Sequence, residues 1–278
     1  MTSIVTWNIQ CGQGCDGIID LERIAAVTRA LGDADVICFQ EVSRNDPGIA
    51  SGADQATVLG TLFSGYEAFF GAGLDRKNEN GKERRQFGNV LLSRLPVLQV
   101  FRHLLPRPAD GGLKHMQRVA IEAVVQSASG LLRVATTHLE YYSVKQRRAQ
   151  VAQLRALQKE ISENAASPPA AGETPYDPLP RPASLVLCGD FNLLPDDAEY
   201  RLLFSQDEIH LVDAWRKTHA GKPHPPTTGL YDRKQWEHGG HCRDYFALTP
   251  DLAPRIASLE MDDKSDASDH QALRLVLV

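Results

Sequence analysis

Short apolar segments recur along the whole chain, and this recurrence is the sequence feature that most restricts the fold. Several of them, such as residues 4–7 and 185–188, are continuously apolar, as is typical of strands that are covered on both faces. We predict strands at residues 4–7, 36–40, 87–92, 119–125, 132–137, 185–188, 245–248 and 272–278. The chain is therefore expected to build its core from sheets.

Helical periodicity appears between these strands at residues 21–31, 54–63 and 144–163. In the first of these segments Leu21, Ile24 and Leu31 share one face, and Asp20 has the residue type of an N-cap. Strands and helices alternate without a break in composition. We therefore predict a single α/β domain over residues 1–278, with layered sheets.

The composition indicates a large core and a mildly acidic surface. Of the 278 residues 42% are hydrophobic, so a core can form without disulfides or a structural metal. The formal net charge is −5. This charge argues against a protein held to nucleic acid mainly by global positive charge, although a local basic groove stays open. The five cysteines are irregularly spaced, which we interpret as free thiols in a reducing compartment.

The sequence shows no secretory signal and no membrane span. Its first residues have neither a charged segment nor an apolar one, and no stretch reaches the roughly 18 consecutive apolar residues that a span requires. We expect a cytoplasmic protein that is monomeric by default.

Two groups of charged or histidine side chains have more than one interpretation. The predicted loop 75–86 and the start of the helix 144–163 are rich in Lys and Arg, so they form either a positive rim for an anionic substrate or an ordinary solvated surface. The predicted loop 219–241 holds several histidines next to Cys242. Their spacing fits no ordinary zinc finger, and we favour free loop histidines as the interpretation. A lid or substrate loop is the alternative, since the segment directly precedes Asp244.

Polar side chains follow the apolar strands in a repeated way. Asn8 follows the first strand, Glu41 the second, His138 the strand 132–137, and Asp190 the strand 185–188. Layered folds collect their active sites at such strand ends. One polar residue there would mean little, because carboxylates commonly begin turns. Four together favour a functional site.

Asp190 and Asn192 are two residues apart, so in extended geometry their side chains point to one face. A carboxylate there can orient or deprotonate a water, and the amide can donate to the charge that develops on a phosphoryl oxygen. The alternative for these two residues alone is an Asx-turn.

Asp269 and His270 lie just before the last predicted strand. A carboxylate beside a histidine can bind a hard cation with the first residue and a phosphate with the second. Oxygen ligands favour Mg²⁺ or Mn²⁺ over Zn²⁺, for which several His or Cys ligands would be expected. An acidic surface loop with an incidental histidine is the alternative.

Taken together, the motifs resemble those of the endonuclease/exonuclease/phosphatase (DNase I-like) superfamily, in the right order from residue 4 to residue 278. This superfamily includes pancreatic-type DNases, AP endonucleases, neutral sphingomyelinases and inositol polyphosphate 5-phosphatases. The motifs are Thr6-Trp7-Asn8, Gln40-Glu41-Val42, Gly88-Asn89 with Leu91-Leu92-Ser93-Arg94, Thr137-His138-Leu139, Gly189-Asp190-Phe191-Asn192, Arg243-Asp244-Tyr245-Phe246 and Ser268-Asp269-His270.

The resemblance implies a four-layer α/β/β/α sandwich, in which two mostly antiparallel sheets pack together between helices. It also implies that Glu41 is the principal metal ligand, with Asn8 and Asp269 near the same Mg²⁺ or Mn²⁺ ion. Asp190 would position and activate the attacking water, and Asn192 would hold a phosphoryl oxygen.

The remaining roles concern the phosphate and the leaving group. His270, paired with Asp244, would stabilise the pentacoordinate phosphorus or protonate the leaving group, and His138 would donate to the phosphate from the other side. Asp244 would raise the pKa of His270 and so favour imidazolium as the donor. Asn89, which would support the pocket, and Arg118 are the candidates for binding substrate.

Some positions depart from the family pattern. Gln10 stands where AP endonucleases usually carry an acidic residue, and His138 where they place a tyrosine; the histidine is closer to the DNase and sphingomyelinase pattern. Arg243 replaces a residue that is more commonly apolar, so it either reaches the site or pairs with a surface acid.

We therefore predict a divalent-metal-dependent phosphoesterase that acts by in-line attack of water, with a nuclease-like phosphodiesterase favoured and nucleic acid as its candidate substrate. The first alternative is a small-molecule or lipid-headgroup phosphoesterase, similar to sphingomyelinases or inositol phosphatases. Exposed aromatic residues near the site would favour lipids, and a long basic groove would favour nucleic acid. A non-catalytic binding module is disfavoured, because every catalytic position holds a competent residue.

Overall fold

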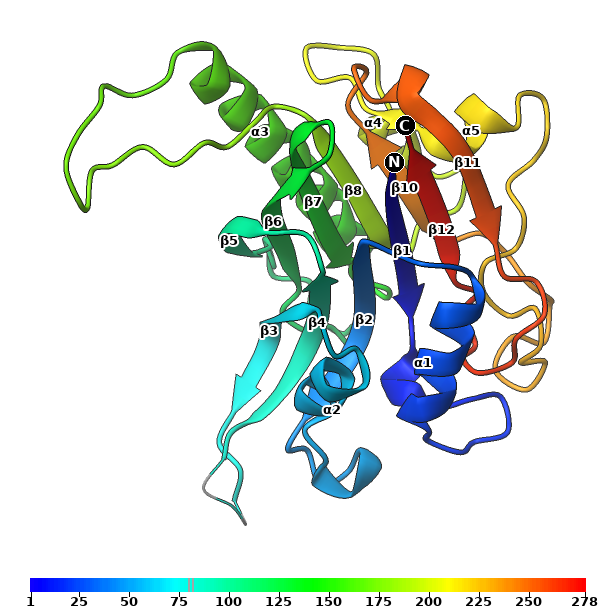
Figure 1. The fold of residues 1–278 in the computed structure, drawn as a ribbon. Coiled ribbons are helices and arrows are strands. Elements are labelled where there is room, and N and C mark those ends of the chain that lie inside the picture. The colour runs from blue at the N-terminus through cyan, green and yellow to red at the C-terminus, as the bar shows by residue number, and fades with distance from the viewer. Residues whose placement is uncertain (80, 82) are drawn as a thin grey trace.

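The computed structural model describes residues 1–79, 81 and 83–278, and its core consists of two sheets packed face to face between helices (Figure 1). This arrangement confirms the predicted four-layer sandwich. The first sheet has the order β11 (Ile256–Met261), β12 (Leu273–Leu277), β1 (Thr2–Asn8), β2 (Val36–Arg44), β4 (Arg85–Ser93), β3 (Glu67–Arg76). The second has the order β5 (Val97–Leu104), β6 (Val119–Ser127), β7 (Gly130–His138), β8 (Leu185–Asp190), β10 (Asp244–Leu248), β9 (Val212–Asp213).

Each sheet contains one parallel pair, and these pairs determine where the polar strand ends meet. β1 runs parallel to β2 with Asn8 opposite Gln40, and β7 runs parallel to β8 with His138 opposite Asp190. The carboxyl ends of parallel strands lie at the same edge of a sheet. Since the two sheets also contact each other through β1 and β8 and through β2 and β7, all four ends lie at one edge of the sandwich.

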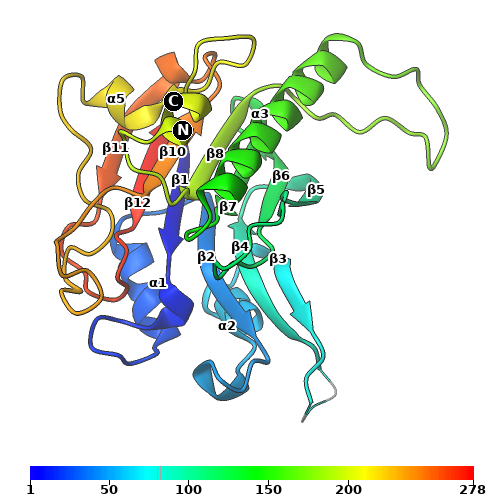
Figure 2. The ribbon, with the colours of Figure 1, turned by 180° about the vertical axis from the view of Figure 1, so that it is seen from behind.

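The outer layers of the sandwich consist of helices. α1 (Leu21–Ala30) and α2 (Gln55–Leu62) pack on the first sheet, while α3 (Val144–Ala166) and α4 (Ala198–Leu203) pack on the second (Figure 2). The side chains of Asp20, Asp54 and Ser143 each accept a hydrogen bond from the backbone N–H three residues later. The remaining helical elements are α5 (Ala214–Thr218), η1 (Gln10–Gly12), η2 (Ala50–Gly52) and η3 (Ala253–Arg255).

Strands at the sheet margins, and the short helices, were not predicted. β3 and β5 consist mostly of exposed and partly buried residues, and β9 spans only two residues. Edge strands of this kind lack the continuous apolar run by which buried strands are found. The predicted loop 75–86 is shorter than expected, because β3 continues to Arg76 and β4 begins at Arg85. Lys82 of that loop lies outside the described residues.

Three further features complete the description of the fold. The segment between α3 and β8 is irregular and extends away from the sandwich in both views (Figures 1 and 2). All five cysteines are unpaired thiols, and only Cys15 is more than marginally exposed. Within the described residues, every helix is too short or too polar to cross a membrane.

Candidate active site

Glu41 enters the site through an irregularity in β2. The pairing of β2 with β4 shifts between Phe39 and Val42, and Glu41 has a left-handed φ of 57°. A bulge of this kind redirects a side chain at the end of a strand. The carboxylate of Glu41 consequently lines the cleft at the edge of the sandwich.

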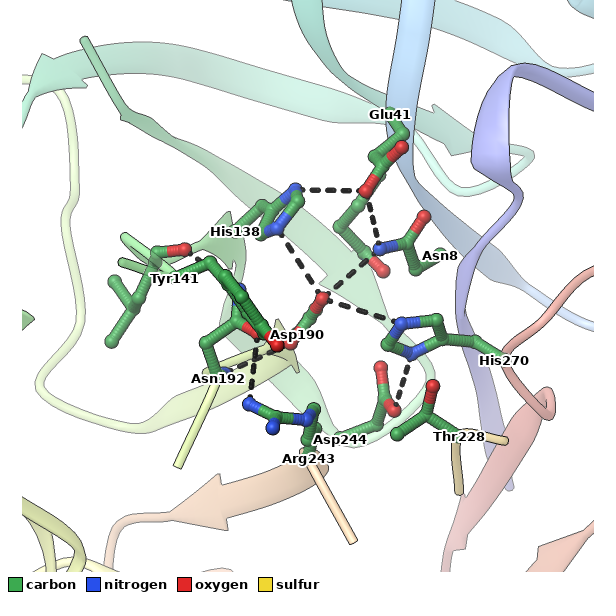
Figure 3. A network of polar contacts seen from close by, with 12 residues as sticks. Asn8, Glu41, His138, Tyr141, Asp190, Asn192, Thr228, Arg243, Asp244 and His270 are labelled. Carbon is green, nitrogen blue, oxygen red and sulfur yellow. Dashed lines mark hydrogen bonds and ion pairs between the residues drawn. The ribbon is translucent and has the colours of Figure 1, made fainter. Parts of the chain in front are cut away.

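Asn8 links the carboxylates of the two sheets. Its Nδ2 donates to Glu41 Oε1 and to Asp190 Oδ2, both at 3.0 Å, while its Oδ1 accepts the backbone N–H of Gln10 at 3.1 Å (Figure 3). The amide is completely buried. The nitrogen of Asn8, rather than its oxygen, therefore faces the carboxylates, and the side chain positions them as a donor.

Asp190 lies at the centre of the polar network. Its Oδ2 is 3.3 Å from Nε2 of His138 and 3.7 Å from Nε2 of His270, and its Oδ1 accepts the backbone N–H of Asn192. Burial by itself raises the pKa of Asp190, but the two histidines and the Asn8 amide outweigh this effect and lower it. Asp190 is thus a carboxylate at neutral pH.

The two histidines beside Asp190 differ in charge. Burial and the nearby Arg118 lower the pKa of His138 to about 3, so its imidazole is neutral. With Nε2 beside Asp190, the proton is best placed on that nitrogen, and Nδ1, which is 3.9 Å from Glu41 and lacks a hydrogen-bond partner, remains an acceptor. For His270 burial lowers the pKa, but the carboxylates of Asp244, Asp190 and Asp269 outweigh it and raise the pKa well above its usual value.

Asp244 holds His270 from behind. Its Oδ2 is 2.9 Å from Nδ1 of His270 and accepts the hydroxyl of Thr227 at 2.6 Å. All three side chains are buried, and the carbonyl of His270 accepts the indole N–H of Trp7. His270 is therefore fixed with Nε2 toward Asp190, and the pairing predicted between Asp244 and His270 is present.

Asn192 faces the opposite side of the network. It has a left-handed φ of 51°, its Nδ2 donates to the carbonyl of Leu139 at 2.9 Å, and its Oδ1 accepts from Arg243 at 3.2 Å. The guanidinium of Arg243 also lies 5.0 Å from the ring centre of Tyr141 and 5.3 Å from that of Trp236. Of the two interpretations of Arg243, the structure supports the one in which it reaches the site.

These side chains surround an open cleft of about 560 Å³. Its lining consists of Gln10, Glu41, Phe87, Met116, Arg118, His138, Tyr141, Tyr142, Asp190, Asn192, Gln235, Trp236, Asp269 and His270. Arg118, a candidate for binding substrate, is among these lining residues. Its Nε is 3.2 Å from Glu140, and its Nη1 is buried without a hydrogen-bond partner.

Asn89 lies elsewhere. Its Nδ2 donates to the carbonyl of Val119 at 3.0 Å, and it is buried between β4 and β6 without lining the cleft. This side chain joins the two sheets, so we do not retain Asn89 as a substrate-binding residue.

Three arginines of the predicted positive rim are engaged in contacts within the protein. Arg84 pairs with Asp75, and Arg85 lies 3.9 Å from Asp46. Arg147 is buried, where its guanidinium donates to two backbone carbonyls. These contacts favour the interpretation of a solvated surface for the first segment and a structural role for Arg147.

The donor set fits a hard divalent cation. Glu41, Asp190 and Asp269 all line the cleft, and burial together with the charge of Asp269 raises the pKa of Glu41 against the effect of the Asn8 amide. Such mutual repulsion of carboxylates is relieved by a bound cation, and oxygen donors favour Mg²⁺ or Mn²⁺. Within the described residues, ligand atoms of Asp190, Asp244 and His270 also lie within 4.8 Å of one another.

Several side chains of the site were not identified from the sequence. Gln40 donates to Thr6 and Thr136 on opposite sheets, at 3.1 and 2.8 Å, and Gln235 and Trp236 both donate to Asp269 at 3.2 Å. The sequence indicated the segment 219–241 as a lid or substrate loop, but it has no periodicity from which a particular contact could be found.

Comparison with known proteins agrees with this geometry. The family model described as "Endonuclease/Exonuclease/phosphatase family" matches residues 5–270. The chain belongs to this family. The match includes the strand ends and all the polar residues of the network, from Asn8 to His270. Nucleases and phosphatases act on phosphate esters, so membership supports phosphoesterase activity. No curated protein matches the sequence.

Several solved structures share the fold of this chain. An endonuclease/exonuclease/phosphatase from Beutenbergia cavernae is 26% identical, with a TM-score of 0.73 over 99% of this chain and 70% of that chain. A mannosyl-6-phosphatase from Bacteroides thetaiotaomicron is 14% identical, with a TM-score of 0.71 over the whole of both chains. A 3′ phosphatase from Neisseria, bound to a product DNA hairpin, is 16% identical, with a TM-score of 0.64 over the whole of both chains.

Proposed function

We propose that this protein is a divalent-metal-dependent phosphoesterase that hydrolyses its substrate by in-line attack of water. The observation that supports this most directly is the placement of Asp190 between a neutral and a charged imidazole, 3.3 and 3.7 Å away. A buried carboxylate in that position can orient a water and take its proton, while the imidazolium on the other side supplies positive charge and a proton.

Each neighbouring side chain has a role in this proposal. His138 and Asn8 hold Asp190 in place, and His270 donates from Nε2 to the leaving-group oxygen or to the phosphoryl group. The second N–H of the Asn192 amide is not used by Leu139 and is available to a phosphoryl oxygen. Arg118 binds the phosphate through its unpartnered Nη1.

The metal would be held chiefly by Glu41 and Asp269. When bound, Mg²⁺ or Mn²⁺ supplies charge neutralisation for the phosphoryl group. Asn8 keeps Glu41 oriented for this role, so we revise its predicted part from metal ligand to positioning residue.

Phosphodiesters, including those of nucleic acid, are the leading substrates, because the cleft offers apolar surfaces on both sides of the polar centre. Tyr141 and Trp236 lie on one side, and Phe87 and Met116 on the other. The second candidate is a small-molecule or lipid-headgroup ester, since Tyr141 and Tyr142 are 38% and 53% exposed beside the site. The activities after which the structural neighbours are named, on a sugar phosphate and on a DNA end, are compatible with both candidates.

The first experiment measures hydrolysis of bis-p-nitrophenyl phosphate and p-nitrophenyl phosphate with Mg²⁺ or Mn²⁺. We expect activity that excess EDTA abolishes and that Asp190→Asn lowers about 10²- to 10⁴-fold. Asp177→Asn, which changes an exposed carboxylate in the irregular segment before β8, is the matched control. Activity that survives EDTA, or an Asp190→Asn protein as active as the control, would refute the assignment. Sphingomyelin, inositol phosphates and DNA then complete the substrate panel.

A further inference from the structure

Residues 231–241, named the crossing segment below, form an ordered turn at the edge of the sandwich. The side chain of Asp232 accepts the backbone N–H groups of Lys234 and Gln235 at 3.1 and 3.0 Å. The backbone N–H of Trp236 donates to the carbonyl of Asp232 at 3.1 Å, and the hydroxyl of Tyr231 donates to the carbonyl of Asp263. These bonds give the segment a defined conformation.

The crossing segment contacts the first sheet's side of the cleft through Gln235. Nε2 of Gln10, in η1 directly after β1, donates to Oε1 of Gln235 at 3.2 Å. In the middle of the edge, Gln235 and Trp236 each donate to Oδ2 of Asp269 at 3.2 Å. The segment therefore lies against one of the proposed metal ligands.

On the second sheet's side the crossing segment meets the residues that follow β7. The rings of Trp236 and Tyr141 are 6.3 Å apart in an edge-to-face arrangement, and Arg243 lies next to both rings. Edge-to-face ring pairs and cation–π contacts of this kind are attractive, so they hold Trp236 against this side of the cleft. Contacts through the crossing segment thus continue from Gln10 on the first sheet to Tyr141 on the second.

This connection lies at one end of the cleft only. Asp269 precedes β12 and Arg243 precedes β10, and these two strands occupy the same end of the packed sheets. Phe87 of β4, together with Met116 and Arg118 just before β6, lines the cleft toward the other end of the packed sheets.

We propose that the crossing segment closes one end of the cleft, so that the bond hydrolysed belongs to a small phosphate ester or lies at the end of a chain. A polymer cut at an interior bond continues past the phosphate in both directions, and here one direction is occupied by Gln235 and Trp236. The inference rests on the proposed phosphoesterase function and narrows its substrate class.

Gly229 provides a way to displace the crossing segment without removing any of its side chains. A Cβ atom at Gly229 would lie 2.7 Å from Cβ of Trp236, and the residue has a left-handed φ of 70°. Gly221 in the same loop has a φ of 78° but nothing within 4 Å of such an atom. Gly229→Ala therefore pushes Trp236 away, whereas Gly221→Ala introduces only the backbone strain.

The first test compares a circular single-stranded DNA with the linear molecule of the same sequence and with bis-p-nitrophenyl phosphate. We expect wild-type protein to hydrolyse the small ester, or to shorten the linear DNA from an end, and to leave the circle intact. Cleavage of the circle at a rate within about threefold of the linear DNA would overturn the inference. If none of the three is hydrolysed, the proposed function itself has failed.

The second test compares Gly229→Ala with Gly221→Ala. It also includes a binding measurement, which can be made even if no substrate is hydrolysed. In Gly229→Ala we expect the ratio of circle cleavage to small-ester hydrolysis to rise at least tenfold, with no change in Gly221→Ala; a ratio is insensitive to a general loss of active protein. Binding of labelled circular and linear DNA, measured by fluorescence anisotropy on the Asp190→Asn background, requires no turnover. Equal affinity for both DNAs, unchanged by Gly229→Ala, contradicts a closed end even in an inactive protein.

Discussion

Two buried aspartate–histidine pairs lie near each other in this protein and do different things. Asp244 is 2.9 Å from His270, and Asp213 is 2.7 Å from His224. Asp213, His224 and Asp244 even line the same small internal cavity of about 10 Å³. The chemistry of the two pairs is the same, so their surroundings determine their roles.

The two pairs differ in the groups that contact the second imidazole nitrogen of the histidine and the carboxylate of the aspartate. His224 is enclosed by the rings of Tyr200 and Tyr245, and Asp213 also accepts from the hydroxyl of Tyr200 and from backbone N–H groups at the start of α5. His270, in contrast, turns its second nitrogen toward Asp190 and lines the cleft. A pair whose partners are all internal stabilises the fold, and a pair with one end in the cleft can act on a ligand.

The largest expected effect tests the cleft pair. His270→Ala should lower kcat/KM for bis-p-nitrophenyl phosphate about 10²- to 10⁴-fold, because it removes the proton donor and the positive charge beside Asp190. His224→Ala, assayed at a temperature where it is folded, should stay within about threefold of wild type. Steady-state kinetics of both variants decide this, and equal losses of activity would erase the proposed difference between the pairs.

The second prediction concerns stability, for which the internal pair should matter more than the cleft pair. His224→Ala should lower the free energy of unfolding by about 3–5 kcal/mol, because it leaves the carboxylate of Asp213 buried without its partner. Urea denaturation followed by circular dichroism measures the change, with the exposed His238→Ala as the control. A His224→Ala protein as stable as the control would show that the pair does not support the fold.

The third prediction adds the metal to the comparison. Mg²⁺ at 100 times its Kd should stabilise the wild type by about 2.7 kcal/mol, because it binds the folded state and not the unfolded chain. A thermal melt should show this shift in Asp213→Asn but not in Glu41→Gln. Persistence of the full shift in Glu41→Gln would exclude that residue as the principal ligand.

The smallest effect is a pH dependence of the internal pair. Burial raises the pKa of Asp213, but the hydrogen bonds from His224, Tyr200 and the backbone outweigh it, so the folded pKa is lowered. A depressed carboxyl pKa contributes stability above the unfolded value of about 3.9, and this contribution is lost as the pH falls through the folded value.

The stability gap between wild type and Asp213→Asn should therefore be constant above about pH 5 and shrink in more acidic solution. Urea melts at a series of pH values measure the gap. For Asp177→Asn, whose carboxylate is exposed, no such trend is expected. A gap for Asp213→Asn that widens toward low pH would mean that the sign of the shift is wrong.

Particular residues show which parts of the fold and of the candidate site could be predicted from the sequence. The strand ends at Asn8 and Asp190 were predicted because continuous apolar runs mark buried strands, and parallel pairing then places their ends at one edge. The Asp244–His270 pair came from the family resemblance and is present at 2.9 Å. Edge strands such as β3 were missed, since half-exposed residues carry no continuous apolar signal.

The sequence by itself determined the layered fold, the family and the set of polar residues at the strand ends, because short-range patterns of apolar and polar residues encode them. Tertiary structure decided the rest. It turned the nitrogen of Asn8 toward the carboxylates, placed Asn89 between the sheets, and brought Trp236 onto Tyr141. Each of these contacts joins segments far apart in the chain, and its geometry depends on how the two sheets pack rather than on any local pattern.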